Sequence, residues 1–157
     1  MNEWNFKDGK GPVPAHKHTN GSGWVSDTAS VADSAYVGAY ARVFGDATVS
    51  GNASVFGNAM IYGEALISGN AQISGNAIVF SKAIVSEKAK VYGSSLVFGD
   101  AKVSGNADVF GNAIVFGDAK VSRNAVISEH AEVSGNARVY GDTKISGDEV
   151  VSGENGC

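Results

Sequence analysis

Residues 101–120 read AKVSGNADVFGNAIVFGDAK, a stretch in which one six-residue pattern repeats with small variations. Each repeat holds a small residue, a variable residue and an aliphatic residue, and then three residues rich in Ser, Phe, Gly, Asn and Asp. The aliphatic position recurs at every sixth residue from Val25 to Val151, 22 times in succession, and is always Val or Ile. A fixed short period is typical of a solenoid, and a six-residue period predicts a parallel β-helix.

The small and the aliphatic residue of each repeat are predicted to point inward. Side chains alternate along a strand, so Ala101 and Val103 share one side while Lys102 faces the other. The Gly that comes later in the repeat suits a corner, because Gly adopts a positive φ without steric cost, and the following Asn or Asp tolerates tight turns. The small position is Ala in most repeats, and its exceptions are Gly23, Ser95, Thr143 and Glu149.

The residues that follow the aliphatic position show a longer period of 18 residues. One such series is aromatic throughout: Phe44, Tyr62, Phe80, Phe98 and Phe116. The next series is serine throughout: Ser50, Ser68, Ser86, Ser104 and Ser122. Three repeats are therefore predicted to close one coil, which gives an all-β prism of triangular cross-section. About seven coils at about 4.8 Å each would make it about 34 Å long.

This repeat resembles the hexapeptide-repeat family of left-handed parallel β-helices over residues 25–152. The resemblance implies a left-handed coil. In the commonest form of that family Gly directly follows the aliphatic residue, whereas here this occurs only at Val37-Gly38 and Gly otherwise comes one residue later. Many members are acyltransferases that work between subunits with a catalytic His, so the resemblance implies an acyltransferase as one alternative function.

The chain is predicted to have two parts, a capping segment over residues 1–22 and the β-helix over residues 23–157. The first part lacks the repeat and contains Trp4 and Phe6, which we expect to fold over the first coil. Glu149 occupies an inward position near the other end, where a charge would discourage association between strand edges.

Bulk properties exclude several functional classes. A net charge of −4 is too mild for general nucleic-acid binding. No apolar stretch is long enough for a membrane span or a secretory signal. We therefore expect a soluble protein that binds neither nucleic acid nor membrane and that is cytoplasmic unless it belongs to a larger assembly.

One side of the prism is predicted to be apolar. Met60, Ile78, Leu96 and Ile114 point outward at 18-residue spacing, next to the aromatic series of Phe44, Tyr62, Phe80, Phe98 and Phe116. Stacking between coils would explain the aromatic residues, but it would not explain the outward aliphatic ones. Exposed apolar patches of this kind usually mark an interface, so we expect a homo-oligomer, either a dimer or a trimer, with another protein partner as the alternative.

A second side carries Lys102, Lys120 and Arg138 on successive coils. Stacked cations repel one another and would favour an anion, and the neighbouring serine series offers hydroxyl donors. A small anionic ligand is thus a further hypothesis, and with it a sequestering or inhibitory role.

His130 is the candidate catalytic base. It lies 18 residues from both Asn112 and Asp148, so Asp148 is placed to orient it. However, the 22 repeats run without the inserted loop and the helical cap that acyltransferases of the family typically carry. The favoured interpretation is a non-catalytic scaffold or binding module with no cofactor.

Two further patterns bear on metal binding. His16 and His18 have a His-x-His spacing that could bind a metal if a third ligand were near. A corner series of acidic residues suggests Ca²⁺, but a linear series rarely supplies six oxygen ligands, and Lys82 interrupts it. We therefore expect no metal site. That acidic series consists of Asp46, Glu64, Asp100 and Asp118.

Overall fold

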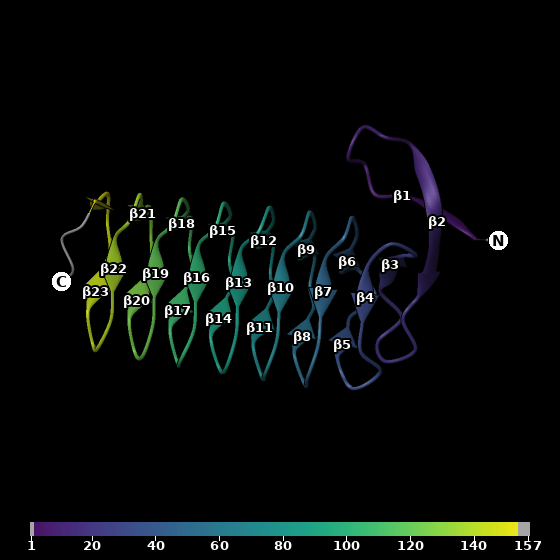
Figure 1. Ribbon diagram of the computed structural model, residues 1–157, viewed down its shortest axis with the longest axis horizontal. Coiled ribbons are helices and arrows are strands. Elements are labelled where there is room, and N and C mark those ends of the chain that lie inside the picture. Colours follow the sequence, from purple (N-terminus) through teal and green to yellow (C-terminus); the bar gives the residue numbers. More distant parts are fainter. Residues whose placement is uncertain (1, 154–157) are drawn as a thin grey trace.

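The computed structural model describes residues 2–153, and over that range it consists of strands β1 to β24 in three sheets, with no helix. Figure 1 shows the coils stacked along one long axis, with the N-terminal strands at one end. The all-β solenoid of about seven coils predicted from the repeat is confirmed.

The three sheets form the three sides of the prism. The first sheet contains, in spatial order, β1 (Glu3–Asn5), β2 (Pro12–Lys17), β3 (Trp24–Ser26), β6 (Arg42–Val43), β9 (Met60–Ile61), β12 (Ile78–Val79), β15 (Leu96–Val97), β18 (Ile114–Val115), β21 (Glu132–Ser134) and β24 (Val150–Ser152). The second contains β4 (Ser30–Val31), β7 (Thr48–Val49), β10 (Leu66–Ile67), β13 (Ile84–Val85), β16 (Lys102–Val103), β19 (Lys120–Val121) and β22 (Arg138–Val139). The third contains β5 (Tyr36–Val37), β8 (Ser54–Val55), β11 (Gln72–Ile73), β14 (Lys90–Val91), β17 (Asp108–Val109), β20 (Val126–Ile127) and β23 (Lys144–Ile145).

Successive coils pair in parallel with a shift of 18 residues. Lys102 lies opposite Lys120, and Val103 lies opposite Val121. The corners are bonded as well as the strands, since the amide of Asn106 donates to the carbonyl of Arg123 at 2.7 Å. Each coil is therefore bonded to its neighbour along its whole perimeter.

The inward positions form a single apolar column. Every inward residue from Ala35 to Val139 is fully buried, including Ser95, whose hydroxyl donates to the carbonyl of Tyr92 at 2.8 Å. Burial of one Val side chain contributes about 1.5–3 kcal/mol, so this column is the main source of stability. Glu149, at the corresponding position of the last described coil, is exposed, because that coil has a neighbouring coil on one side only.

The second residue of most corners is a Gly with positive φ, as at Gly105 (φ 67°). A side chain there is doubly unfavourable, since a Cβ on Gly105 would lie 2.6 Å from the backbone nitrogen of Arg123 in the next coil. Left-handed backbone costs a residue other than Gly about 1–2 kcal/mol. Four residues nevertheless adopt it at this corner position: Ser81, Glu87, Arg123 and Glu129.

The N-terminal strands cover the first coil. β2 pairs antiparallel with both β1 and β3, and thereby extends the first sheet. The loop that follows β2 bonds to β5 in the same way: the amide of Gly23 donates to the carbonyl of Val37, and the carbonyl of Asn20 accepts from the amide of Val37. Strand edges that would otherwise invite association are thus paired.

An aromatic ladder runs along the corner between the first and second sheets. Its rings are stacked at centroid distances of 4.8–5.0 Å, and Phe6 from the N-terminal segment is its first member. Phe44 is only 6% exposed, because the ring of Phe6 stacks on it and covers the first rung of the ladder. The ladder consists of Phe6, Phe44, Tyr62, Phe80, Phe98 and Phe116.

Inward and outward positions should respond differently to the same substitution. Val103→Asn removes a fully buried aliphatic side chain and leaves an amide without partners, and should cost about 3–4 kcal/mol of unfolding free energy. Ser104→Asn, at the adjacent corner residue, should cost less than about 0.5 kcal/mol. Urea unfolding followed by circular dichroism measures both, and equal losses would contradict the observed burial.

Stability should fall at high pH through Tyr62. Burial in the ladder raises the pKa of its phenol above the ordinary value of 10.0, because the phenolate is poorly solvated there. The folded state therefore keeps the proton to higher pH than the unfolded state, and this contribution to stability is complete below pH 10.0 and is lost as the pH rises through the folded pKa. Urea unfolding at pH 8 and pH 11 should show a smaller loss for Tyr62→Phe than for the wild type. Tyr40→Phe, at a largely exposed residue, is the control and should lose as much as the wild type.

Candidate functional site

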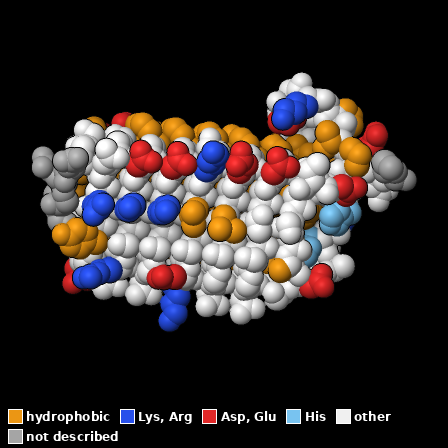
Figure 2. Space-filling view, viewed as in Figure 1, with side chains coloured by type: hydrophobic (Ala, Val, Ile, Leu, Met, Phe, Trp, Pro, Cys, Tyr) orange, Lys and Arg blue, Asp and Glu red, His pale blue; other side chains and the backbone are white. Residues whose placement is uncertain are grey.

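The first candidate surface lies on the first sheet, and we call it the apolar face. Its aliphatic row consists of Met60, Ile78, Leu96 and Ile114, which lie directly opposite one another in β9, β12, β15 and β18 and are all partly exposed. The ladder from Tyr62 to Phe116 flanks this row. Figure 2 shows the hydrophobic side chains as a nearly continuous band along one edge of the prism. The structure therefore places the predicted apolar residues together.

Opposite charges end the aliphatic row. Arg42 in β6 lies opposite Met60, and Glu132 in β21 lies opposite Ile114, so the row reads Arg, four apolar residues, Glu. Both charged side chains are partly exposed, and neither forms a salt bridge within residues 2–153. Arg42 and Glu132 were not among the interface residues predicted from the sequence, although they lie one coil before and one coil after the aliphatic residues of this face. The 18-residue spacing was the signal that could have shown it.

The N-terminal segment forms a shoulder at one end of the apolar face. Phe6 and Ala15 form a small cluster with Phe44, and Met60 and Tyr62 pack against it. At the opposite end the ladder position is taken by Ser134 and Ser152, which carry no ring. The open part of the ladder therefore begins at Tyr62 and ends at Phe116.

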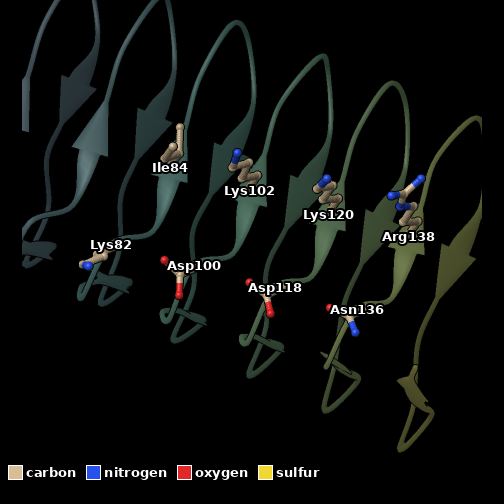
Figure 3. A pocket seen from close by; sticks show the side chains of 8 residues that line it. All are labelled: Lys82, Ile84, Asp100, Lys102, Asp118, Lys120, Asn136 and Arg138. Carbon is tan, nitrogen blue, oxygen red and sulfur yellow. The ribbon is translucent and has the colours of Figure 1, made fainter. Parts of the chain in front are cut away.

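The second candidate surface is a groove of about 980 Å³ on the second sheet, which we call the charged groove. Lys102, Lys120 and Arg138 line it from successive strands and are all exposed, as predicted. Figure 3 shows Asp100 and Asp118 at the adjacent corner, and Figure 2 shows the two rows of charge side by side. Within residues 2–153 none of these cations lies within salt-bridge distance of a carboxylate.

A smaller depression of about 400 Å³ adjoins the charged groove and shares Lys120 and Arg138 with it. Its other lining residues are Ser122, Arg123 and Tyr140, so no carboxylate lines it. The Arg123 guanidinium carbon lies 5.9 Å from the centre of the Tyr140 ring. Sequence reasoning missed Arg123 and Tyr140, which stand in columns otherwise occupied mainly by Gly and by Ser.

The structure brings His130 close to Asp148, as the sequence predicted. The Nδ1 atom of His130 lies 3.7 Å from an Asp148 oxygen, and its Nε2 atom lies 3.4 Å from the Asn112 side-chain nitrogen. All three side chains are exposed at a corner. An exposed pair of this kind contributes little electrostatic energy, because water screens it.

The two N-terminal histidines point to different partners. His16 Nδ1 lies 2.8 Å from an oxygen of Asp27, whereas His18 is buried and its Nε2 lies 3.0 Å from the carbonyl oxygen of Ala35. Across residues 2–153 no three His, Cys, Asp or Glu side chains are grouped so as to hold a metal ion. The acidic corner series lies within these residues and forms no such group. It consists of Asp46, Glu64, Asp100 and Asp118.

Residues 2–153 contain no helix with the length and hydrophobicity to cross a bilayer.

Three segments of the chain match the family model described as YdcK Beta solenoid repeat: residues 41–55, 71–87 and 131–147. Each segment begins at an inward alanine, and together they cover about a third of the chain. A search of the curated proteins found no match. The family description concerns a structural repeat and not an activity, so it bears on the fold alone. The chain is a parallel β-solenoid, and three of its segments are similar in sequence to the YdcK beta solenoid repeat.

Proposed function

We propose that this protein is a non-catalytic scaffold that self-associates through the apolar face, with two copies running antiparallel about a two-fold axis. The observation that carries the proposal is the row from Arg42 to Glu132, in which two opposite charges bracket four apolar residues.

The apolar side chains supply the driving force. Removal of apolar surface from water stabilises an interface by about 25 cal/mol per Å², and exposed patches of a few hundred Å² are usually interaction sites. The aliphatic row and the ladder from Tyr62 to Phe116 are both available for this. A second copy is the best-matched occupant, because its side chains recur at the same coil spacing of about 4.8 Å and can interdigitate along the whole face.

The charges select the antiparallel orientation. A two-fold axis perpendicular to the solenoid and passing between Ile78 and Leu96 places each of them opposite the other in the second copy. The same axis places Met60 opposite Ile114, and Arg42 opposite Glu132, twice by symmetry. A parallel arrangement in register would instead place Arg42 opposite Arg42, and like charges across an interface are unfavourable.

The ends of the apolar face support the same orientation. In an antiparallel pair the shoulder at Phe6 and Phe44 faces the end of the second copy where the ladder has given way to Ser134 and Ser152. Small side chains at that end leave room for the shoulder.

The apolar face should be required for association. Ile78→Lys combined with Leu96→Lys should turn the dimer into a folded monomer, because both side chains point outward and do not fill the core. The matched control is Leu66→Lys with Ile84→Lys, which makes the same chemical change at outward positions of the second sheet and should leave a dimer.

Sedimentation velocity gives the mass and circular dichroism the fold of each variant. The proposal is wrong if the wild type sediments as a monomer, or if the control dissociates as readily as the variant on the apolar face.

Charge reversal should test the orientation separately. Arg42→Glu alone, or Glu132→Arg alone, should weaken dimerisation about tenfold or more, because each creates two like-charged pairs in the antiparallel dimer. The double variant should recover most of the wild-type affinity, since each pair is then restored with its signs exchanged. Dilution series in the ultracentrifuge measure these constants, and a double variant weaker than either single one would sink the antiparallel arrangement.

A further inference from the structure

We infer that the depression between Lys120, Arg123 and Arg138 binds a small oxyanion of the phosphate class. This site lies on the second sheet and its adjoining corner, away from the apolar face, and it does not depend on self-association. It extends the row of Lys102, Lys120 and Arg138 by a cation from a different structural element.

The depression is cationic in an otherwise acidic chain. Its lining is Lys120, Ser122, Arg123, Arg138 and Tyr140, whereas the chain as a whole carries a net charge of −4. Asp118 belongs to the adjacent charged groove and not to this lining. Asp142, at the same corner as Arg123, accepts a hydrogen bond from the Asn124 side chain at 2.9 Å.

Arg123 occupies a backbone conformation that disfavours a side chain. Its φ is 62°, and the equivalent residues in the coils before and after it are Gly105 and Gly141. At the equivalent corner position Glu87 offsets this strain, because its carboxylate accepts a hydrogen bond from the amide of Gly105 at 2.7 Å. The Arg123 guanidinium is instead held over the ring of Tyr140 at the rim of the depression. The positive φ is shared by Ser81, Glu87 and Glu129, so what distinguishes Arg123 is the position of its guanidinium beside the Tyr140 ring.

The side chains suit a phosphate group. An arginine fork can donate two parallel hydrogen bonds to two phosphate oxygens, while Lys120 adds a point charge and Ser122 a hydroxyl donor. Lys120 and Arg138 lie directly opposite each other on neighbouring strands, where like charges repel. A bound anion would relieve that repulsion. The exposed ring of Tyr140 offers a stacking surface if the ligand carries a ring.

Calorimetric titration with inorganic pyrophosphate at low ionic strength tests the site. The decisive variant is Arg123→Gly, which removes the cation and installs the residue found in the neighbouring coils, so it relieves strain and keeps the fold. It should weaken pyrophosphate binding about tenfold, the loss expected for one charge-assisted contact.

Two controls separate the site from general effects. Ser81→Gly relieves the same backbone strain without changing charge, and Lys144→Gln removes one positive charge from the third sheet in the same coil as Arg138. Both should leave the affinity within about twofold of the wild type. The monomeric Ile78→Lys/Leu96→Lys protein should still bind, so failure of self-association would not be mistaken for failure of this site.

Phenyl phosphate compared with inorganic phosphate identifies the kind of ligand. Tighter binding of phenyl phosphate that Tyr140→Ser removes would assign a ring-bearing phosphate ester, whereas equal affinity would assign the free anion. The inference is overturned if pyrophosphate shows no saturable binding, if Lys144→Gln weakens it as much as Arg123→Gly, or if Arg123→Gly binds as the wild type does. It is also overturned if no anion binds and Arg138→Gln instead lowers the mass of the oligomer, since this surface would then be a protein interface.

Discussion

The structure depends on the hydrogen bonds that join each coil to the next at a constant shift along the chain. The backbone amide of Lys102 donates to the carbonyl of Ala119, and the backbone amide of Asn106 donates to the carbonyl of Arg123. Strand and corner residues therefore follow the same register. An inserted residue would displace every later inward side chain from the apolar column, because side chains alternate between inside and outside. A constant repeat length is therefore required to keep the core continuous. The outward side chains, which form straight rows along the solenoid, are the positions that can vary.

Those rows explain why much of the architecture could be predicted. The alternation seen at Ala101 and Val103 indicates the inward positions, and the aromatic and serine series indicate three repeats per coil. The position of Phe6 could not be predicted, because the N-terminal segment lacks the repeat and its ring joins the ladder only through the antiparallel pairing of β2 with β3. Glu149 is exposed in the last described coil, where the repeat places a charge instead of the small residue that is buried in the coils before it.

The candidate surfaces were predictable in part. The apolar residues and the three stacked cations were assigned to their faces by spacing alone. The importance of Arg42 and Glu132 emerges only when a row is considered from end to end, with its register to a second copy in mind. Arg123 and Tyr140 were missed because each breaks its own column. In a solenoid, a residue that departs from its 18-residue series is as informative as the series itself. The fold needs only the repeat, so such a residue is a candidate for another role.

The two ends of the solenoid are not equivalent. The first coil is covered by β2 and by the loop leading to β3, whereas at the far end Val150 is 62% exposed and Glu149 is exposed beside it. In a stack stabilised by nearest-neighbour contacts, a coil with a single neighbour has the lowest opening free energy. Within the stack formed by residues 2–153, β24 pairs only with β21, so its amide protons should exchange faster than those of strands paired on both sides. We therefore expect local opening to begin at the coil that contains β24, while β2 keeps the first coil closed.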